Sequence, residues 1–191
     1  MAREGKAYVL SEVEMEQFKA FLCAQRHSER NSAIYLLTRR AGLRIGEVSK
    51  LKMSDVIDSQ GEVKNVSTLR SGVTKGKKVR TAYFNHPELI SALTKYISAR
   101  PKYKSDYLFV SQKGKEFSPN SMCEMMSNLY HKAGFEGASS HSGRRGAASA
   151  LLRSGLDIVS LSKVLGHSSI STTQGYIEVD QNKLMNAMAT A

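Results

Sequence analysis

The spacing of apolar residues follows a helical period along most of this chain and changes most clearly between residues 56 and 84. Apolar side chains recur every three or four positions in residues 11–25, 30–41, 87–99 and 118–131, and this spacing predicts helices with one buried face. Between residues 56 and 84, β-branched and polar residues alternate between turn residues, which predicts an antiparallel sheet of three strands. The chain is therefore expected to be mostly α with a small antiparallel β-sheet (α+β).

Capping residues mark several of the predicted helix ends. Ser11 and Glu14 have the spacing of a capping box, and Asp157 can cap a helix that ends at Gly166. The stretch LRIGEVSKLKMSDV predicts one short helix, with Asp55 just beyond its end. These local signals predict where the chain changes direction between helices.

The charge of the chain favours a polyanionic partner. Its 191 residues carry a formal net charge of +11, and residues 61–120 hold 12 lysines and arginines against 4 aspartates and glutamates, a net +8. Such an excess attracts nucleic acids, although a basic surface that is only solvated explains it equally well. A chain of this length can bury one full core and no linker divides it, so we expect a lead-in over residues 1–10 and one domain over 11–191.

Cysteine content and hydropathy bear on the compartment. Cys23 and Cys123 form no C-x-x-C pair and lie in apolar helical patterns, so we expect buried free thiols in a reducing compartment. No apolar run approaches the roughly 18 residues that a membrane helix requires, and MAREGKAYVL lacks the hydrophobic core of a signal peptide. We therefore expect a cytoplasmic protein that does not enter a membrane.

Reactive polar groups are concentrated in the last third of the chain, from His141 to Tyr176. His141 and Arg144 are three residues apart and share one face of a helical first turn. Cleaving a phosphodiester without a metal requires arginines that bind the charged oxygens, a Lys or His that protonates the leaving oxygen, and a nucleophile such as a tyrosine hydroxyl. The chain offers these groups as Arg44, Lys75, His141, Arg144, His167 and Tyr176.

Each of these residues also has a purely structural explanation when taken alone. Arg44 could pair with Glu47 on a helix surface, His167 could stabilise a helix C-terminus, and Lys75 could belong to a solvated turn. A metal site is not expected, because the histidines lack cysteine or carboxylate partners at suitable spacing and the sequence has no dense acidic cluster of the two-metal nuclease kind. We expect neither a metal nor a cofactor.

Several motifs follow one another in a defined order. AGLRIGEVSKLKMSD fits the pattern G-x-R-x-x-E-x-x-x-L-x-x-x-D through Gly42, Arg44, Glu47, Leu51 and Asp55. HSGR then fits H-x-x-R, LGH follows, and TTQGY fits T-T-x-x-Y. Over nearly its whole length the chain resembles the tyrosine recombinases, or phage-type integrases, and TKGKK lies where that family keeps a β-hairpin lysine. The resemblance implies the tyrosine recombinase catalytic-domain fold.

The same resemblance implies a DNA strand transferase that needs no metal or cofactor. Arg44 and Arg144 would bind the scissile phosphate, and His141 and His167 would hydrogen-bond it, with His141 also transferring a proton. Tyr176 would attack the phosphorus and become a 3′-phosphotyrosine, which retains the energy needed to rejoin a strand without ATP. The reaction would be site-specific recombination, with integration, excision and inversion all left open.

The lysine assignment and the oligomeric state also follow from the resemblance. Lys75 would be the general acid toward the leaving 5′ oxygen, although Lys77 lies in the same basic turn and is an alternative. The implied partners are double-stranded DNA, further copies of the chain in a homotetramer on paired sites, and DNA-bending accessory proteins. The residues after Tyr176, with apolar side chains at helical spacing, would dock on a neighbouring protomer or else pack on their own domain.

Two features depart from the family pattern. The family commonly has a histidine directly after the second arginine, whereas this chain has Arg145 followed by Gly146. Most members also carry an N-terminal helical domain, whereas some ten residues precede the first predicted helix here. The chain thus resembles short members such as the fimbrial phase-switch invertases, or an excised catalytic domain. Two other functions stay open: a regulator that binds DNA without cutting it, and a topoisomerase-like enzyme.

Overall fold

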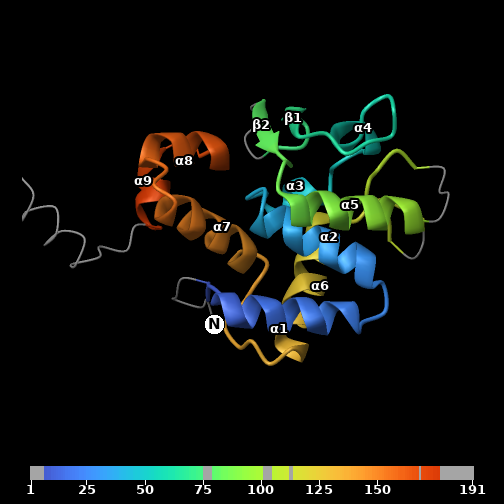
Figure 1. Ribbon diagram of the computed structural model, residues 1–191, viewed down its shortest axis with the longest axis horizontal. Helices are drawn as coiled ribbons and strands as arrows, with labels where there is room; N and C mark the ends of the chain where they lie inside the picture. Colours follow the sequence, from blue (N-terminus) through green and yellow to red (C-terminus); the bar gives the residue numbers. More distant parts are fainter. Residues whose placement is uncertain (1–6, 75–78, 101–104, 112–113, 168, 177–191) are drawn as a thin grey trace, which may run out of the picture.

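The computed structural model describes residues 7–74, 79–100, 105–111, 114–167 and 169–176, and the structural statements below concern these residues. Within them the chain is mostly helical with one two-stranded antiparallel sheet, which confirms the predicted fold class (Figure 1). In chain order the elements are α1 (Glu12–Cys23), α2 (Ser28–Arg39), α3 (Ile45–Val48), α4 (Met53–Val56), β1 (Val66–Leu69), β2 (Arg80–Tyr83), α5 (Pro87–Ala99), α6 (Pro119–Lys132), α7 (Ser142–Arg153), α8 (Ile158–Leu165) and α9 (Ile170–Gln174).

The capping residues found in the sequence form the helix ends that they predict. At the start of α1, the Glu14 amide donates to the Ser11 hydroxyl at 3.3 Å, and the Ser11 amide donates to the Glu14 carboxylate at 2.8 Å. At the start of α8, the Asp157 carboxylate accepts from two first-turn amides at 2.9 Å each. Gly166 ends α8 in the left-handed conformation with φ 65°, which glycine adopts without steric cost.

The stretch predicted to form one short helix forms two, α3 and α4. The helix is interrupted because the backbones of Leu51 and Met53 pair with residues 106–108 instead of continuing the helical ladder. Asp55 consequently lies inside α4 rather than beyond the helix. Its buried carboxylate accepts two hydrogen bonds from Arg70, at 3.0 and 2.8 Å, so it connects α4 to the end of β1.

The sheet is smaller than predicted. β1 and β2 pair antiparallel, with Val66 opposite Tyr83, whereas the third expected strand is reduced to an isolated bridge between Ile57 and Val63. Asp58 explains this reduction, because its carboxylate accepts from the amides of residues 60 and 62 and closes a tight turn there. The prediction of three strands is therefore wrong for the described residues, and most of the basic turn TKGKK lies outside them.

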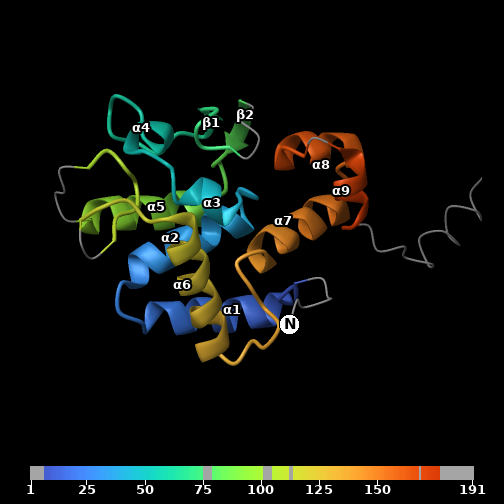
Figure 2. The ribbon, with the colours of Figure 1, turned by 180° about the vertical axis from the view of Figure 1, so that it is seen from behind.

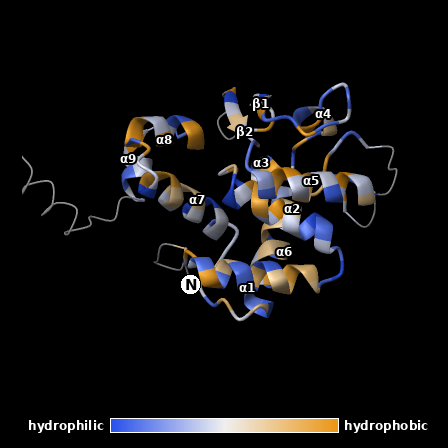
Figure 3. Ribbon diagram, viewed as in Figure 1, coloured by the Kyte–Doolittle hydropathy of each residue, from blue (hydrophilic) through white to orange (hydrophobic). Residues whose placement is uncertain are grey.

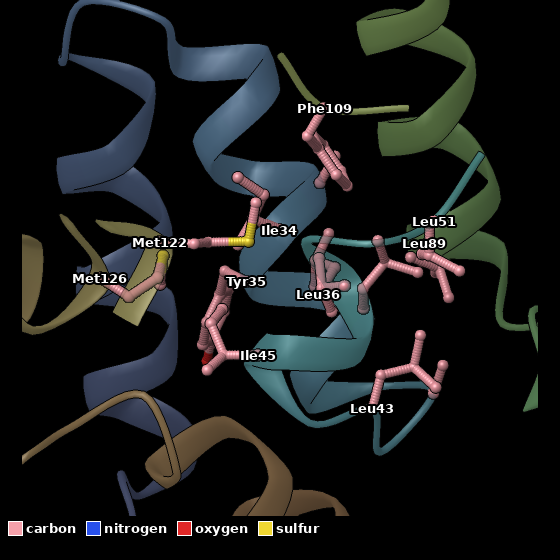
Figure 4. Close-up of a cluster of buried hydrophobic side chains, with 14 of the residues drawn as sticks. Ile34, Tyr35, Leu36, Leu43, Ile45, Leu51, Leu89, Phe109, Met122 and Met126 are labelled. Carbon is pink, nitrogen blue, oxygen red and sulfur yellow. The ribbon is translucent and has the colours of Figure 1, made fainter. Parts of the chain in front are cut away.

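The main core lies where α1, α2 and α6 meet and extends to α5. Phe18 stacks on Tyr130 with ring centroids 4.3 Å apart, and Tyr35 meets Phe18 edge-on. Figure 4 shows Tyr35 beside Met122 and Met126 in this core. Hydrophobic and hydrophilic residues mix along outer helices such as α1 and α8 (Figure 3), as expected for helices that bury one face.

Two glycines allow α7 to approach α2 closely. A Cβ atom added to Gly143 would overlap the hydroxyl of Thr38, and one added to Gly146 would lie 3.1 Å from Arg39 Nε. Larger residues at these positions would push the two helices apart. The close approach matters because it fixes the position of the first turn of α7 relative to the loop that follows α2.

From this crossing, α7 runs away from the main core toward α8 and α9 (Figures 1 and 2). There a second, smaller buried cluster forms from Ala148, Leu161 and Leu165, and Tyr176 packs against it. α8 in turn contacts β2, so the last described helices rest against the sheet. The C-terminal helices therefore connect the main core to the position of Tyr176.

Two expectations about the surface can also be compared with the structure. Cys23 is exposed at the end of α1, so the prediction of a buried thiol is wrong for this residue, whereas Cys123 is half-buried. The inward positions of α1 are Met15, Phe18 and Leu22, and Cys23 lies about 100° further round the helix. In the described ranges, no helix has both the length and the apolar content needed to cross a bilayer.

Candidate active site

The structure brings four of the predicted site residues together from distant parts of the chain. Arg44 directly precedes α3, Arg144 lies in the first turn of α7, His167 follows the end of α8, and Tyr176 follows α9. Arg144 Nη2 is 3.0 Å from His167 Nε2, and the rings of His167 and Tyr176 lie nearly parallel. Arg44 joins them by donating to the carbonyl of Gly166 at 3.2 Å, across 122 positions of sequence.

The two remaining predicted residues are His141, which the structure describes, and Lys75, which it does not. His141 is the N-cap residue of α7, three positions before Arg144, and its side chain is exposed. Its backbone amide donates to the Ser139 hydroxyl at 3.3 Å, which helps to shape the turn into the helix. Lys75, the predicted general acid, and its alternative Lys77 both lie outside the described residues.

Glu47 is the acceptor around which the arginines gather. Its side chain is 2% exposed, and its carboxylate lies 3.1 Å from Arg44 Nη1, 2.6 Å from Arg80 Nη2 and 3.9 Å from Arg144 Nη1. Burial would raise the pKa of this carboxyl, but the hydrogen bond and charge of Arg80, with help from Arg44 and Arg144, lower it below its usual value. We call these three arginines around Glu47 the arginine cluster.

Arg80, on β2, is a member of this cluster that the sequence motifs did not identify. Its side chain is 8% exposed, and besides Glu47 it donates to the carbonyl of Val164 at 2.8 Å. A signal was present in the strand, because Arg80 shares the inward face with the buried residues Ala82 and Phe84. An arginine aligned with core residues indicates a buried partner.

Arg144 is held firmly before any ligand arrives. It is 3% exposed, and its guanidinium donates to the carbonyls of Gly42 at 2.6 Å and Leu165 at 2.7 Å. Burial lowers the pKa of Arg144 to about 10, and the charge of Arg44 acts in the same direction. The group therefore stays protonated near neutral pH and is held in one orientation by these carbonyls.

His167 forms hydrogen bonds through both ring nitrogens. Nε2 is 3.0 Å from Arg144 Nη2, and Nδ1 is 2.8 Å from the hydroxyl of Thr173, which is fully buried. Burial, together with the charges of Arg144, Arg44 and Arg80, lowers the pKa of His167 to about 4, and Glu47 offsets this only in part. His167 is therefore neutral near pH 7 in the free protein. Thr173 belongs to the TTQGY motif, although the sequence alone indicates no role for its hydroxyl.

The pKa of His167 leads to a prediction about stability. The unfolded pKa of histidine is about 6.5, and folding depresses it to about 4, so the contribution of His167 is present above pH 6.5 and is lost as the pH falls toward 4. We expect a steeper decline of the free energy of unfolding over this window in the native chain than in a His167→Gln variant, measured by urea denaturation. Equal slopes would contradict the placement of His167.

Tyr176 lies against His167 and Arg145. Its ring is half-buried, and its centroid is 5.9 Å from that of His167 with an interplanar angle of 10°. The guanidinium carbon of Arg145 lies 5.8 Å from the Tyr176 ring centroid, within the range of a cation–π interaction. Arg145 Nε is buried and has no hydrogen-bond partner among the described residues. The residue that departs from the family pattern therefore touches the predicted nucleophile.

This arrangement is suited to chemistry on an anion. Three guanidinium groups converge on one carboxylate, which leaves excess positive charge beside a tyrosine. Such groups can bind a phosphate and stabilise the charge that builds on its oxygens during displacement. In the part of the chain that the structure describes, no three His, Cys, Asp or Glu side chains converge as metal ligands do.

Known proteins are similar to this chain in sequence and in fold. A model of the phage integrase family matches residues 8–183. The tyrosine recombinase XerC of Caldanaerobacter subterraneus subsp. tengcongensis is 34% identical over 166 residues, which cover 84% of this chain and 44% of that protein. The tyrosine recombinase XerA of Pyrococcus furiosus is 33% identical over 165 residues, which cover 85% of this chain and 54% of that protein.

The fold is similar as well. A crystal structure of XerA recombinase superimposes with a TM-score of 0.79 at 31% sequence identity, covering 97% of this chain and 65% of the other. This chain therefore spans about half the length of the curated relatives named above.

Proposed function

The chain belongs to the phage integrase family, and from this we propose that it is a tyrosine recombinase catalytic unit, which cuts and rejoins DNA strands. One observation carries the proposal: the ring of Tyr176 lies nearly parallel to that of His167, and His167 Nε2 is hydrogen-bonded to Arg144. A nucleophile thus lies beside cations that can hold a phosphate. The resemblance of the motifs extends to the order in which these residues occur in the chain.

In the proposed reaction, Arg44 and Arg144 bind the non-bridging oxygens of the scissile phosphate. The Tyr176 oxygen attacks the phosphorus, a bond forms between them, and the bond from phosphorus to the 5′ oxygen breaks. His141 accepts the phenolic proton, and Lys75 gives a proton to the leaving 5′ oxygen. The reverse steps, with the 5′ hydroxyl of another strand, rejoin the DNA and release the tyrosine.

The charge balance of the arginine cluster supports this division of roles. Glu47 neutralises one of three arginines, and the remaining charge favours an incoming phosphate. The carboxylate also offsets the mutual repulsion of the guanidinium groups before DNA binds. His167 completes the site by hydrogen-bonding the phosphate, as the resemblance implies.

The proposed partners follow from the same reading. We propose double-stranded DNA as the substrate, bound in part by phosphate contacts from the basic residues 61–120, so affinity should decrease with salt. We also propose a homotetramer on paired sites, joined through the residues after Tyr176, which lie outside the described part of the chain. DNA-bending proteins would assist assembly on such sites.

A covalent-capture experiment tests this function. The protein is incubated with a pool of duplexes of randomised sequence that carry nicks, so that a short strand leaves after cleavage and the adduct accumulates. The proposal requires a protein–DNA adduct that survives denaturation and leaves a free 5′ hydroxyl. Binding without any adduct would favour a non-cleaving regulator, and relaxation of a supercoiled plasmid lacking a recombination site would favour a topoisomerase.

Arg145 gives a prediction specific to this chain. Removing its guanidinium from the Tyr176 ring in an Arg145→Ala variant should slow adduct formation about 2- to 30-fold, the range expected for losing a cation–π contact. Arg145→Lys keeps the charge and should recover part of the rate. Arg153→Ala, an exposed arginine on the same helix, is the matched control. Equal rates of adduct formation for both alanine variants would show that Arg145 has no role in the reaction.

A further inference from the structure

A short hydrogen-bond chain connects the buried hydroxyl of Thr173 to the arginine cluster. The hydroxyl lies 2.8 Å from His167 Nδ1, and His167 Nε2 lies 3.0 Å from Arg144 Nη2. A guanidinium is a donor and cannot accept, so Nε2 must be the acceptor in this pair. Nδ1 therefore carries the imidazole proton and donates it to the Thr173 hydroxyl, a tautomer assigned here from donor and acceptor chemistry.

This tautomer is the wrong one for holding a phosphate. Phosphate oxygens accept hydrogen bonds, so His167 can bind them only when Nε2 carries a proton. In the free protein Nε2 has no proton to give and is already occupied by Arg144. Arg144 likewise gives Nη2 hydrogens to His167 and to the carbonyl of Leu165. In the free site these donors and acceptors are thus paired with one another, and phosphate binding must rearrange their hydrogen bonds.

We propose that Thr173 is a positioning residue that allows His167 to change between these two states. In the free protein its hydroxyl accepts from Nδ1, and Nε2 accepts from Arg144. When a phosphate binds, Nε2 gains a proton and donates to a phosphate oxygen, while Nδ1 loses its proton and accepts from the Thr173 hydroxyl. A hydroxyl can do both because it rotates between donating and accepting.

The location of Thr173 makes this role difficult to replace. The residue is fully buried, so solvent cannot take over from the hydroxyl when it is removed. Thr173 also lies on α9, and its carbonyl accepts from the Tyr176 amide at 3.0 Å. His167 is thus positioned by two groups of one segment, the Thr173 hydroxyl and the Tyr176 ring. A change at the imidazole therefore alters the surroundings of Tyr176, the proposed nucleophile.

The charged groups around His167 keep its imidazole neutral, so the rearrangement exchanges one neutral tautomer for the other. Arg144 from α7, Arg44 from the start of α3 and Arg80 from β2 all oppose a positive imidazole, and Glu47 from α3 favours it. A phosphate would place negative charge beside Nε2, which favours the tautomer that carries its proton there. The proposal rests on the proposed function in assigning the anion to the DNA backbone, whereas the tautomer of the free protein is independent of it.

Nitrogen-15 NMR of the full chain labelled on histidine tests the proposal directly. In the free native chain near pH 7.5, His167 should show a protonated Nδ1 and an unprotonated Nε2, with the signals assigned by comparison with His167→Gln. Titration with inorganic phosphate, standing in for the scissile phosphate, should move the proton to Nε2. Thr173→Ser should behave in the same way, whereas Thr173→Val should lose the single tautomer and bind phosphate more weakly.

Several outcomes would overturn the proposal. A free protein with the proton on Nε2 would do so, as would ring signals that do not respond to phosphate or a Thr173→Val variant with the native tautomer and phosphate response. In the covalent-capture assay, Thr173→Val should be slower by roughly 10- to 100-fold, as expected for a buried group left without its partner. Thr173→Ser should restore most of the rate, and Thr172→Val, an exposed neighbour, should resemble the native chain.

Failure of the two proposals can be told apart. If no variant and no native protein forms an adduct, the proposed function fails, yet the NMR measurement still decides the tautomer and its response to phosphate. If the native chain forms adducts while Thr173→Val does so at the native rate, the role of Thr173 fails and the recombinase assignment stands.

Discussion

Replacing Tyr176 with phenylalanine should abolish the covalent adduct with DNA. Phenylalanine lacks the oxygen that would bond to phosphorus, so we expect the rate of adduct formation to fall by at least about 10⁴-fold, as when an essential nucleophile is removed. The ring itself remains, so the contacts with His167 and Arg145 should persist. DNA binding and the free energy of unfolding should therefore stay close to those of the native chain, which separates lost chemistry from lost structure.

The matched control is Tyr83→Phe, on the outer face of β2. Tyr83 is 45% exposed and lies outside the arginine cluster, so removal of its hydroxyl should leave the rate of adduct formation unchanged. Adducts would be detected as labelled DNA that migrates with the protein under denaturing conditions. An adduct of normal yield in Tyr176→Phe would show that another residue attacks the phosphate, and the assignment of the nucleophile would be wrong.

The second large effect is expected at Glu47. In Glu47→Ala, the guanidinium groups of Arg80 and Arg144 stay buried without their carboxylate, and breaking a buried ion pair from one side costs about 3–5 kcal/mol. That is a large fraction of the roughly 5–15 kcal/mol that stabilises an ordinary domain. Urea denaturation would measure the loss, and the adduct assay should show that the phosphate site is lost with it.

Companion variants identify the cause of this destabilisation. Glu47→Gln keeps an oxygen acceptor of similar shape, so it should cost less than Glu47→Ala. The double variant Glu47→Leu/Arg80→Met removes both charges of the closest pair and should be more stable than Glu47→Ala, because it leaves fewer unpaired charges. Glu62→Ala, at an exposed position, should have little effect. If Glu47→Ala proved as stable as Glu62→Ala, the account of the arginine cluster would be wrong.

The helices could be predicted well from sequence because their signals are local. The Ser11 capping box and the Asp157 cap act within one turn, and each produced the helix start that it predicts. The sheet was predicted less well, since Asp58 closes a turn that propensity alone does not distinguish from a longer hairpin. The break between α3 and α4 also depends on residues 106–108, which are distant in sequence.

The candidate site was predictable as a list of residues and less so as an arrangement. Motif spacing selected Arg44 and Arg144. A surface ion pair was one expectation for Glu47, whereas its side chain is buried among three arginines. The contact between Glu47 and Arg80 crosses 33 positions, so strand alternation places Arg80 on the buried face but does not identify Glu47 as its partner. The hydroxyl of Thr173 became informative only when its distance to His167 was known.

The long sequence separation within the arginine cluster has a consequence for protein synthesis. Glu47, Arg44 and Arg80 leave the ribosome early, whereas the carbonyl that accepts from Arg44 belongs to Gly166, 122 residues after it. At about 5–20 residues per second, roughly 4–17 seconds separate Arg80 from Gly166 during translation. A chain whose translation stops in this interval has basic residues but no Tyr176. Under the proposed function, such a chain could bind DNA but could not leave a strand covalently broken.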